Sequence, residues 1–208
     1  MNKGRFISLE GGEGVGKTTC VESVADRIRG WGLELVVTRE PGGTSLGEGL
    51  RSLLLQTRDL AAEAELLMMF AARIQHVRDV ILPALDRGCW VVSDRFTDSS
   101  YAYQGGGRGV SVATLRFMEN LLPGSLRPDL TLLLDAPVEI GQARARARGA
   151  MDRFESEARV FQERVRSAYL ERAAEFPERI VVIDASEAVA CVRSRVVAAL
   201  ERGCARWI

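Results

Sequence analysis

A glycine-rich stretch with a single lysine is the first feature of this sequence that could do chemistry. Residues 8–20 read SLEGGEGVGKTTC and contain the spacing G-x-x-x-x-G-K-[ST] between Gly11 and Thr18. Glycines let backbone N–H groups converge on phosphate oxygens, and the N-terminus of a following helix adds a favourable dipole. Lys17 can reach terminal phosphates, and the Thr18 hydroxyl can hold Mg²⁺. The stretch therefore predicts nucleotide binding, without indicating which reaction follows.

Three further segments carry polar side chains that could contact a ligand. SDRF (93–96) puts a carboxylate beside an arginine, a pair that suits Mg²⁺ and phosphate but is also common as a structural pair. TREPGGT (38–44) carries Arg39 and Glu40 ahead of a turn. DSSYAYQGGGRG (98–109) combines small hydroxyls, tyrosines, a glutamine and glycines, which favours contact with a ligand over a place in the core.

Arginines gather in ARARARGAMDRFE (143–155), around Gly149. One interpretation is a solvated helix face, and it applies best to Arg144 and Arg148, which are four residues apart. The other is an arginine-rich flap, around 144–157, that closes over phosphates.

Alternating apolar segments indicate how these residues are positioned. We predict strands at 5–10, 33–40, 89–94, 131–135 and 179–184, and helices at 18–31, 62–88 (with a kink near Pro83), 111–122, 138–148, 158–174 and 188–202. The pattern predicts one α/β domain over 1–208, a five-stranded parallel sheet with helices on both faces. Such sheets bind ligands at the carboxyl ends of their strands, where Glu10, residues 39–40, residues 94–95, Asp135 and Asp184 lie.

Composition excludes several classes of protein. The 208 residues include 28 basic and 28 acidic side chains, which argues against a broad nucleic-acid surface. No apolar run reaches the length of a membrane span, and the N-terminus does not resemble a signal peptide, so we expect a cytoplasmic location. Cys20, Cys89, Cys191 and Cys204 are widely spaced and are expected to be buried, reduced thiols without a metal.

Six segments occur in the order in which they are found in bacterial thymidylate kinases. They are EGGEGVGKTT, TREPGGT, AAR, DRFTDSSYAYQGGGRG, RPDLTLLLD and RARARGAMDRFE. The chain resembles that family over essentially its whole length. The resemblance implies the P-loop nucleoside monophosphate kinase fold, Mg²⁺, a homodimer, and phosphate transfer from ATP to dTMP, giving ADP and dTDP, in dTTP biosynthesis. An acceptor phosphate is already anionic at neutral pH, so no general base is needed and the lone His76 is not expected to serve as one.

The resemblance also implies roles for particular residues. The catalytic residues implied are Lys17, Arg95, Arg153 and Glu13, and Arg95 is implied to bind the acceptor phosphate. The residues implied to bind Mg²⁺ are Thr18 and Asp94. Arg73 contacts thymine, with Ser100 and Gln104 completing the polar edge, and Tyr103 crowds the 2′ position of the sugar. Further contacts with the substrate are implied for Arg39, Glu40 and Arg51. The residues implied for ATP are Gly11, Gly12, Glu13, Gly14, Val15, Gly16, Lys17, Thr18 and Thr19.

Two assignments stay open. The variable positions of the glycine-rich loop, residues 12–15, carry no basic residue, so the chain resembles the class whose flap supplies the arginine. Arg153 is the first candidate and Arg148 the second. The family usually stacks an aromatic ring on thymine from four residues before the helix arginine. That position is Met69 here, whereas Phe70 lies three before. Either side chain is a candidate for the base.

Other functions remain alternatives. A kinase for another nucleoside monophosphate would share most of these motifs. A nucleotide-dependent switch or binding module would not need the acceptor-like segment 94–109. The sequence also lacks the [NT]KxD motif of common GTPase switches, because its only lysines are Lys3 and Lys17.

Overall fold

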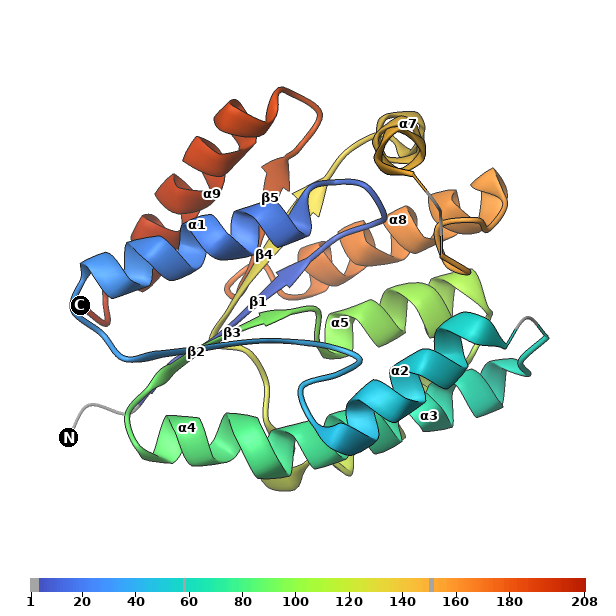
Figure 1. Ribbon diagram of the computed structural model, residues 1–208, viewed down its shortest axis with the longest axis horizontal. Helices are drawn as coiled ribbons and strands as arrows, with labels where there is room; N and C mark the ends of the chain where they lie inside the picture. The colour runs from blue at the N-terminus through green and yellow to red at the C-terminus, as the bar shows by residue number, and fades with distance from the viewer. Residues whose placement is uncertain (1–3, 58, 150–151) are drawn as a thin grey trace.

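Five parallel strands form the centre of the molecule. The computed structural model describes residues 4–57, 59–149 and 152–208. The sheet order is β2-β3-β1-β4-β5, and neighbouring strands pair in parallel (Figure 1). The strands are β1 (Phe6–Glu10), β2 (Leu35–Arg39), β3 (Trp90–Asp94), β4 (Leu130–Asp135) and β5 (Ile180–Asp184). The predicted α/β class and five-stranded parallel sheet are confirmed, with each strand end within about two residues of its expected place.

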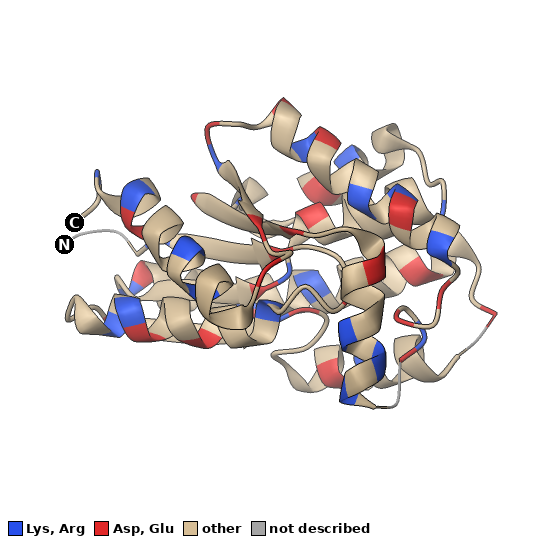
Figure 2. Cartoon of the chain, turned by 90° about the horizontal axis from the view of Figure 1, so that it is seen from above, with Lys and Arg blue, Asp and Glu red and all other residues tan. Residues whose placement is uncertain are grey.

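Helices surround the sheet (Figure 1). They are α1 (Lys17–Gly30), α2 (Ser45–Gln56), α3 (Ala62–His76), α4 (Leu82–Asp86), α5 (Thr97–Ser100), α6 (Val112–Asn120), α7 (Val138–Arg148), α8 (Arg159–Glu175) and α9 (Val189–Cys204). Short turns complete them: the π-helical η1 (Val77–Ile81) and η2 (Tyr101–Gly107) and the 3₁₀ turn η3 (Pro123–Ser125). In the view of Figure 2, basic and acidic residues are interspersed along the helices.

Apolar side chains project from both faces of the sheet, and for this reason the strand sequences are near-continuous hydrophobic runs. On one face Ile7 and Leu9 pack with side chains of α1 and α9. On the other, Phe6 and Val91 pack with side chains of the α3–α4 segment and α6. Within the described parts of the chain, no helix is both long and apolar enough to cross a membrane.

Local structure agrees with one expectation and departs from others. The helix expected at 62–88 runs over 62–86 as α3, η1 and α4, and the π-helical η1 lies just before Pro83, where a kink was expected because the proline ring lacks an N–H and crowds the preceding turn. Helix α2 was not predicted, although Thr44 caps it by accepting a hydrogen bond from Gly47 N at 3.0 Å. Its glycines, Gly47 and Gly49, obscured the helical spacing of its leucines. Cys191 is exposed, not buried.

The strand order creates a crevice between β1 and β3. The chain leaves β1 toward β2 on one side, whereas after β3 it crosses to β4 on the other side of β1. Such a switch point opens a cleft at the carboxyl ends of the two strands. The glycine-rich loop follows β1 and Asp94–Arg95 end β3, so the two strongest chemical signals of the sequence meet there.

Candidate active site

The glycine-rich loop packs so closely that side chains are excluded from parts of it. A Cβ on Gly14, whose φ is +69°, would lie 2.0 Å from the carbonyl oxygen of Gly141 in α7. A Cβ on Gly11 would lie 2.3 Å from the carbonyl oxygen of Leu134 in β4. The loop is therefore held between β1, β4 and α7, and its end at Gly16 starts α1.

Lys17 is folded back onto this loop. Its Nζ donates to the carbonyl oxygens of Gly11 (3.0 Å) and Gly12 (2.6 Å), and the residue is 8% exposed. Burial lowers the pKa of Lys17, and the nearby cation of Arg95 lowers it further, although neighbouring carboxylates oppose the shift. The ammonium group is thus held at the loop by carbonyl oxygens that a phosphate could replace.

Arg95 joins the end of β3 to the loop. Its backbone adopts a positive φ of +73°, uncommon for a residue with a side chain. Its guanidinium donates to Glu13 Oε1 (2.7 Å), to Gly11 O (3.0 Å) and to the hydroxyl of Tyr103 (3.2 Å). Burial alone would raise the pKa of Glu13, but Arg95, followed by Lys17, outweighs it and lowers that pKa. Glu13 is therefore an anionic partner for the two cations.

A cavity of about 650 Å³ opens beside these residues. It extends from the start of α1 to the side chains of β2, α3 and η2, so one space reaches both the loop and the acceptor-like segment. Of the predicted residues, those that line it are Glu13, Gly14, Gly16, Lys17, Thr18, Thr19, Arg39, Glu40, Arg51, Met69, Asp94, Arg95, Tyr103 and Gln104.

The residues present fit a Mg²⁺ ion. Asp94 Oδ1 is buried and has no hydrogen-bond partner among the described residues, and Thr18 lines the same cavity. Mg²⁺ is commonly bound by one or two protein oxygens together with water and substrate phosphates. The described residues accordingly include no cluster of three or more His, Cys, Asp or Glu side chains that could hold a metal ion by themselves.

Comparisons with known proteins decide the family. The family model described as thymidylate kinase matches residues 9–196. The thymidylate kinase of Ectopseudomonas mendocina is 54% identical over 199 residues, covering 95% of each chain, and that of Methylococcus capsulatus is 54% identical over 196 residues, covering 94% of each. A crystal structure of thymidylate kinase from Ehrlichia chaffeensis has a TM-score of 0.77 and 30% identity, covering 95% of this chain and 99% of that one.

The chain belongs to the thymidylate kinase family. Enzymes of this family phosphorylate dTMP to dTDP, so the expected family and the expected phosphotransferase class are confirmed. The alternative of a switch or binding module is set aside.

In this thymidylate kinase, Arg73 lies behind the cavity lining and is 1% exposed. It donates to Glu40 Oε2 (2.6 Å) and to Ser100 Oγ (2.9 Å), and its guanidinium lies 4.8 Å from the centre of the Phe70 ring. Phe70 and Ser100, like Arg73, are fully buried and do not line the cavity, whereas Met69 does. The geometry therefore favours Met69 over Phe70 for contact with a base.

The arginines of residues 143–155 lie in three different environments. Arg144 is not merely solvated, because it donates to the carbonyl oxygens of residues 185–187, at 2.7–3.1 Å. Arg148, the last residue of α7, lines the cavity and pairs with Glu155. Arg153 is turned toward Glu65 of α3 and does not line the cavity. Residues 150 and 151 of the predicted flap lie outside the described residues.

Polar residues outside the cavity lining serve the scaffold. His76 contacts Glu40 Oε1 (2.9 Å) through Nδ1 and Thr38 Oγ1 (2.7 Å) through Nε2, so both ring nitrogens are occupied. Asp135 pairs with Arg166 at 2.8 Å, and Asp184 is exposed beside Ser186. Neither carboxylate lines the cavity that holds Lys17.

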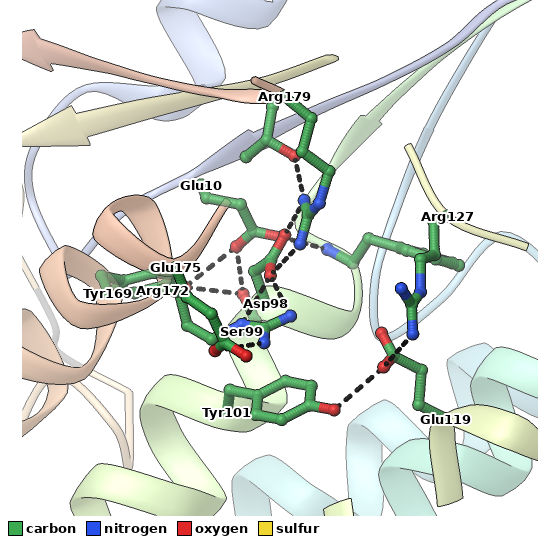
Figure 3. A network of polar contacts seen from close by, with 12 residues as sticks. Glu10, Asp98, Ser99, Tyr101, Glu119, Arg127, Tyr169, Arg172, Glu175 and Arg179 are labelled. Atoms are coloured by element: carbon green, nitrogen blue, oxygen red, sulfur yellow. Dashed lines mark hydrogen bonds and ion pairs between the residues drawn. The ribbon is translucent and has the colours of Figure 1, made fainter. Parts of the chain in front are cut away.

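Sequence reasoning missed a buried polar network beneath the site (Figure 3). Glu10 accepts from Phe96 N (2.7 Å), Ser99 Oγ (2.6 Å) and Tyr169 Oη (3.0 Å). Burial, and next the charge of Asp98, raise the pKa of Glu10 to about 7. By holding the backbone N–H of Phe96, the residue after Arg95, Glu10 helps to fix the unusual backbone of Arg95. The signal in the sequence was a carboxylate at the end of an otherwise apolar strand.

Proposed function

We propose that this chain transfers the terminal phosphoryl group of ATP to dTMP, giving ADP and dTDP, within the 650 Å³ cavity. The observation that carries the proposal is that Lys17 of the phosphate-binding loop and Arg95, Tyr103 and Gln104 of the acceptor-like segment line one continuous space. Membership of the thymidylate kinase family names the acceptor.

The chemistry requires positioning and charge neutralisation. The attacking oxygen of dTMP is anionic, so the residues must bring two polyanions together without a base. Lys17 and Arg95 are held at the loop by carbonyl oxygens and by Glu13. Lys17 exchanges these contacts for the terminal phosphates of ATP, and Arg95 for the phosphate of dTMP. Their charges then stabilise the transition state.

The ATP–Mg²⁺ complex is proposed to lie along residues 11–19. The Thr18 hydroxyl and Asp94 Oδ1, which has no hydrogen-bond partner in the described part of the chain, would hold the ion, directly or through water. When bound, Mg²⁺ supplies positive charge to the transferring phosphoryl group. Glu13 keeps Arg95 and Lys17 in place as partners of opposite charge.

The acceptor is proposed to lie between α3 and η2. Met69 packs on the thymine, Gln104 reads its polar edge with Arg73 and Ser100 buried behind it, and Tyr103 crowds the 2′ position. The same part of the cavity is lined by Arg39, Glu40 and Arg51. These residues contact the acceptor or hold the loop at Pro41, whose carbonyl oxygen accepts a hydrogen bond from Arg51 at 3.1 Å.

We infer that the flap, not the loop, supplies the additional arginine. The loop has no basic residue between Gly11 and Gly16, and Arg148 lies at the cavity. Arg148 is therefore preferred over Arg153 for contact with the transferring group, and Arg153 anchors the flap to Glu65.

A homodimer is a further part of the proposal. Leu67 on α3, Phe117 on α6 and Leu121, which directly follows α6, are 58%, 64% and 49% exposed. Large apolar side chains of this kind suit an interface between copies. Light scattering coupled to size-exclusion chromatography measures the mass. A mass of one chain at micromolar concentration would reject this part alone.

An acceptor panel tests the proposed function. Turnover with ATP and Mg²⁺ is measured for dTMP, dUMP, dCMP, UMP and GMP, and the highest kcat/KM is expected for dTMP. An equal or higher value for another nucleoside monophosphate would support that acceptor instead.

The loop is tested by Lys17→Ala. Turnover is expected to fall by about two to four orders of magnitude, because the lost charge acts where negative charge moves in the transition state. Arg29→Ala, at the exposed far end of α1, is the control and should retain turnover. Near-normal turnover of folded Lys17→Ala would remove the loop from the site.

A further inference from the structure

Glu65 is a buried carboxylate to which the roles above give only an anchoring contact with Arg153. It is fully buried in α3 and lies on the same helix face as Met69 and Arg73, four and eight residues on. It accepts from Arg108 Nε at 3.3 Å and from Arg153, both through Oε2. Its other oxygen, Oε1, accepts from Gln104 Nε2 at 2.8 Å. Paired with two guanidinium groups, it is a carboxylate that can only accept hydrogen bonds.

This partner determines which way the Gln104 amide faces. A carboxamide has one donor end and one acceptor end, and Glu65 can take only the donor. The orientation of the Gln104 amide therefore follows from the chemistry of Glu65. Gln104 is 1% exposed and lines the cavity, and its Oε1 is buried without a hydrogen-bond partner among the described residues. The site thus offers a fixed acceptor that lacks a donor.

We propose that Glu65 is a positioning residue that sets the hydrogen-bonding polarity of Gln104 and so selects acceptor bases with a ring N–H. The inference rests on the proposed function. Thymine has an N–H between two carbonyl groups, which can donate to Gln104 Oε1. Cytosine has an unprotonated nitrogen at the same position and would place two acceptors face to face. Sites built to pair with a donor discriminate strongly against analogues that lack it.

The ratio of two acceptors is the diagnostic quantity. Glu65 also holds Arg153 of the flap, so its replacement can change turnover for every acceptor. That effect cancels when kcat/KM for dTMP is divided by kcat/KM for dCMP. The effect of the Gln104 orientation differs between the two bases, so it remains in the ratio.

The experiment measures this ratio for the wild type, Glu65→Gln, Gln104→Leu, the double variant and Glu119→Gln. An amide at position 65 can donate or accept, which frees Gln104 to turn. The ratio is expected to fall about tenfold or more in Glu65→Gln, chiefly through a higher KM for dTMP. In the Gln104→Leu background the same change should alter the ratio by less than about threefold, because the residue through which it acts is gone.

Glu119→Gln is the matched control. Glu119 is also buried and accepts from the Tyr101 hydroxyl (2.9 Å) and Arg127 (3.3 Å), away from Gln104 in the hydrogen-bond pattern. It should keep the ratio within about threefold of the wild type. An unchanged ratio in folded Glu65→Gln, an equal effect in both backgrounds, or an equal fall in Glu119→Gln would overturn the inference. Absence of dTMP phosphorylation by the wild type would instead reject the proposed function.

A substrate analogue keeps the inference testable if Glu65→Gln does not fold. Methylation of the thymine ring nitrogen removes the N–H. The wild type is expected to lose about tenfold or more in kcat/KM with methylated dTMP, relative to dTMP, and Gln104→Leu less than about threefold. Equal losses in the two enzymes would overturn the inference.

Discussion

Tyr103 shows how a single side chain can serve both halves of the site. Its hydroxyl donates to Glu13 Oε1 at 2.5 Å and accepts from Arg95 at 3.2 Å, and its ring packs edge-on against Phe154. Burial raises the pKa of Tyr103 well above its ordinary value, so the hydroxyl remains protonated and can keep donating. The ring is thereby held rigidly at the cavity, as a steric filter for the sugar requires.

Tyr103→Ala is expected to relax sugar selection. Removing the ring opens the space beside the 2′ position, so the kcat/KM ratio of dTMP to its ribo analogue should fall about tenfold or more. Tyr103→Phe keeps the ring and is the matched control, in which the ratio should be preserved even if the rate drops. An unchanged ratio in Tyr103→Ala would mean that Tyr103 only packs.

At the scale of elements, the arginine-rich segment proposed as a flap is bound to the rest of the molecule at separate points. Arg144 binds the carbonyl oxygens that follow β5, and Arg153 binds Glu65 of α3. Arg148 lies between these anchors, at the end of α7 and beside the cavity. Arg144 also lines the cavity but is bound to three carbonyl oxygens, whereas Arg148 is paired with Glu155, and we propose that Arg148 exchanges this carboxylate for phosphate.

Arg148→Ala is therefore expected to cost more turnover than Arg153→Ala. A contact made mainly in the transition state lowers turnover with little change in ground-state binding. We expect a fall of about two orders of magnitude for Arg148→Ala and about tenfold or less for Arg153→Ala. Calorimetric titration of ATP and dTMP, alongside turnover, checks both. The opposite order would assign the phosphate contact to Arg153.

At the scale of the whole molecule, the network of Figure 3 joins elements far apart in the chain. Glu10 at the end of β1 bonds to Tyr169 of α8, and Asp98 of α5 accepts two hydrogen bonds from Arg179, at 2.7 and 2.9 Å. Buried charges of this kind stabilise a fold only while each keeps its partners.

Glu10 is expected to make stability depend on pH. The folded chain holds the Glu10 proton up to a pKa of about 7, against an ordinary value of 4.5. The folded state binds that proton more tightly, so its contribution to stability is complete at low pH and is lost as pH rises from about 4.5 through about 7. Glu10→Gln should gain up to roughly 3 kcal/mol over the wild type across that window.

Urea unfolding of both proteins at pH 5, 6, 7 and 8 measures this difference. Glu22→Gln, which removes an exposed carboxylate of α1, is the control and should parallel the wild type. A constant difference between Glu10→Gln and the wild type over this range would contradict the prediction.

Asp98→Ala is expected to lower the free energy of unfolding by about 3–5 kcal/mol, because it leaves the Arg179 and Arg172 guanidinium groups without their shared carboxylate. Asp26→Ala removes an exposed ion pair with Arg29 and should cost less than about 1 kcal/mol. A loss below about 1 kcal/mol in Asp98→Ala would show that the network does not stabilise the fold.

The sequence by itself determined the phosphate-binding loop, the five strands, the parallel sheet and the thymidylate kinase family. These depend on local features: the spacing of Gly11, Gly16 and Lys17, and apolar runs of strand length. Helix α2 was not predicted because its glycines weakened the helical spacing of apolar residues, which is the same kind of local signal.

Only the tertiary structure decided which side chains meet. Met69 and Phe70 are adjacent, yet the packing of α3 against the sheet places one at the cavity and buries the other. The bond between Glu65 and Gln104 spans 39 positions, and that between Glu10 and Tyr169 spans 159. Such contacts depend on how helices dock on the sheet, because local periodicity specifies which face of a helix is buried but not which partner that face meets.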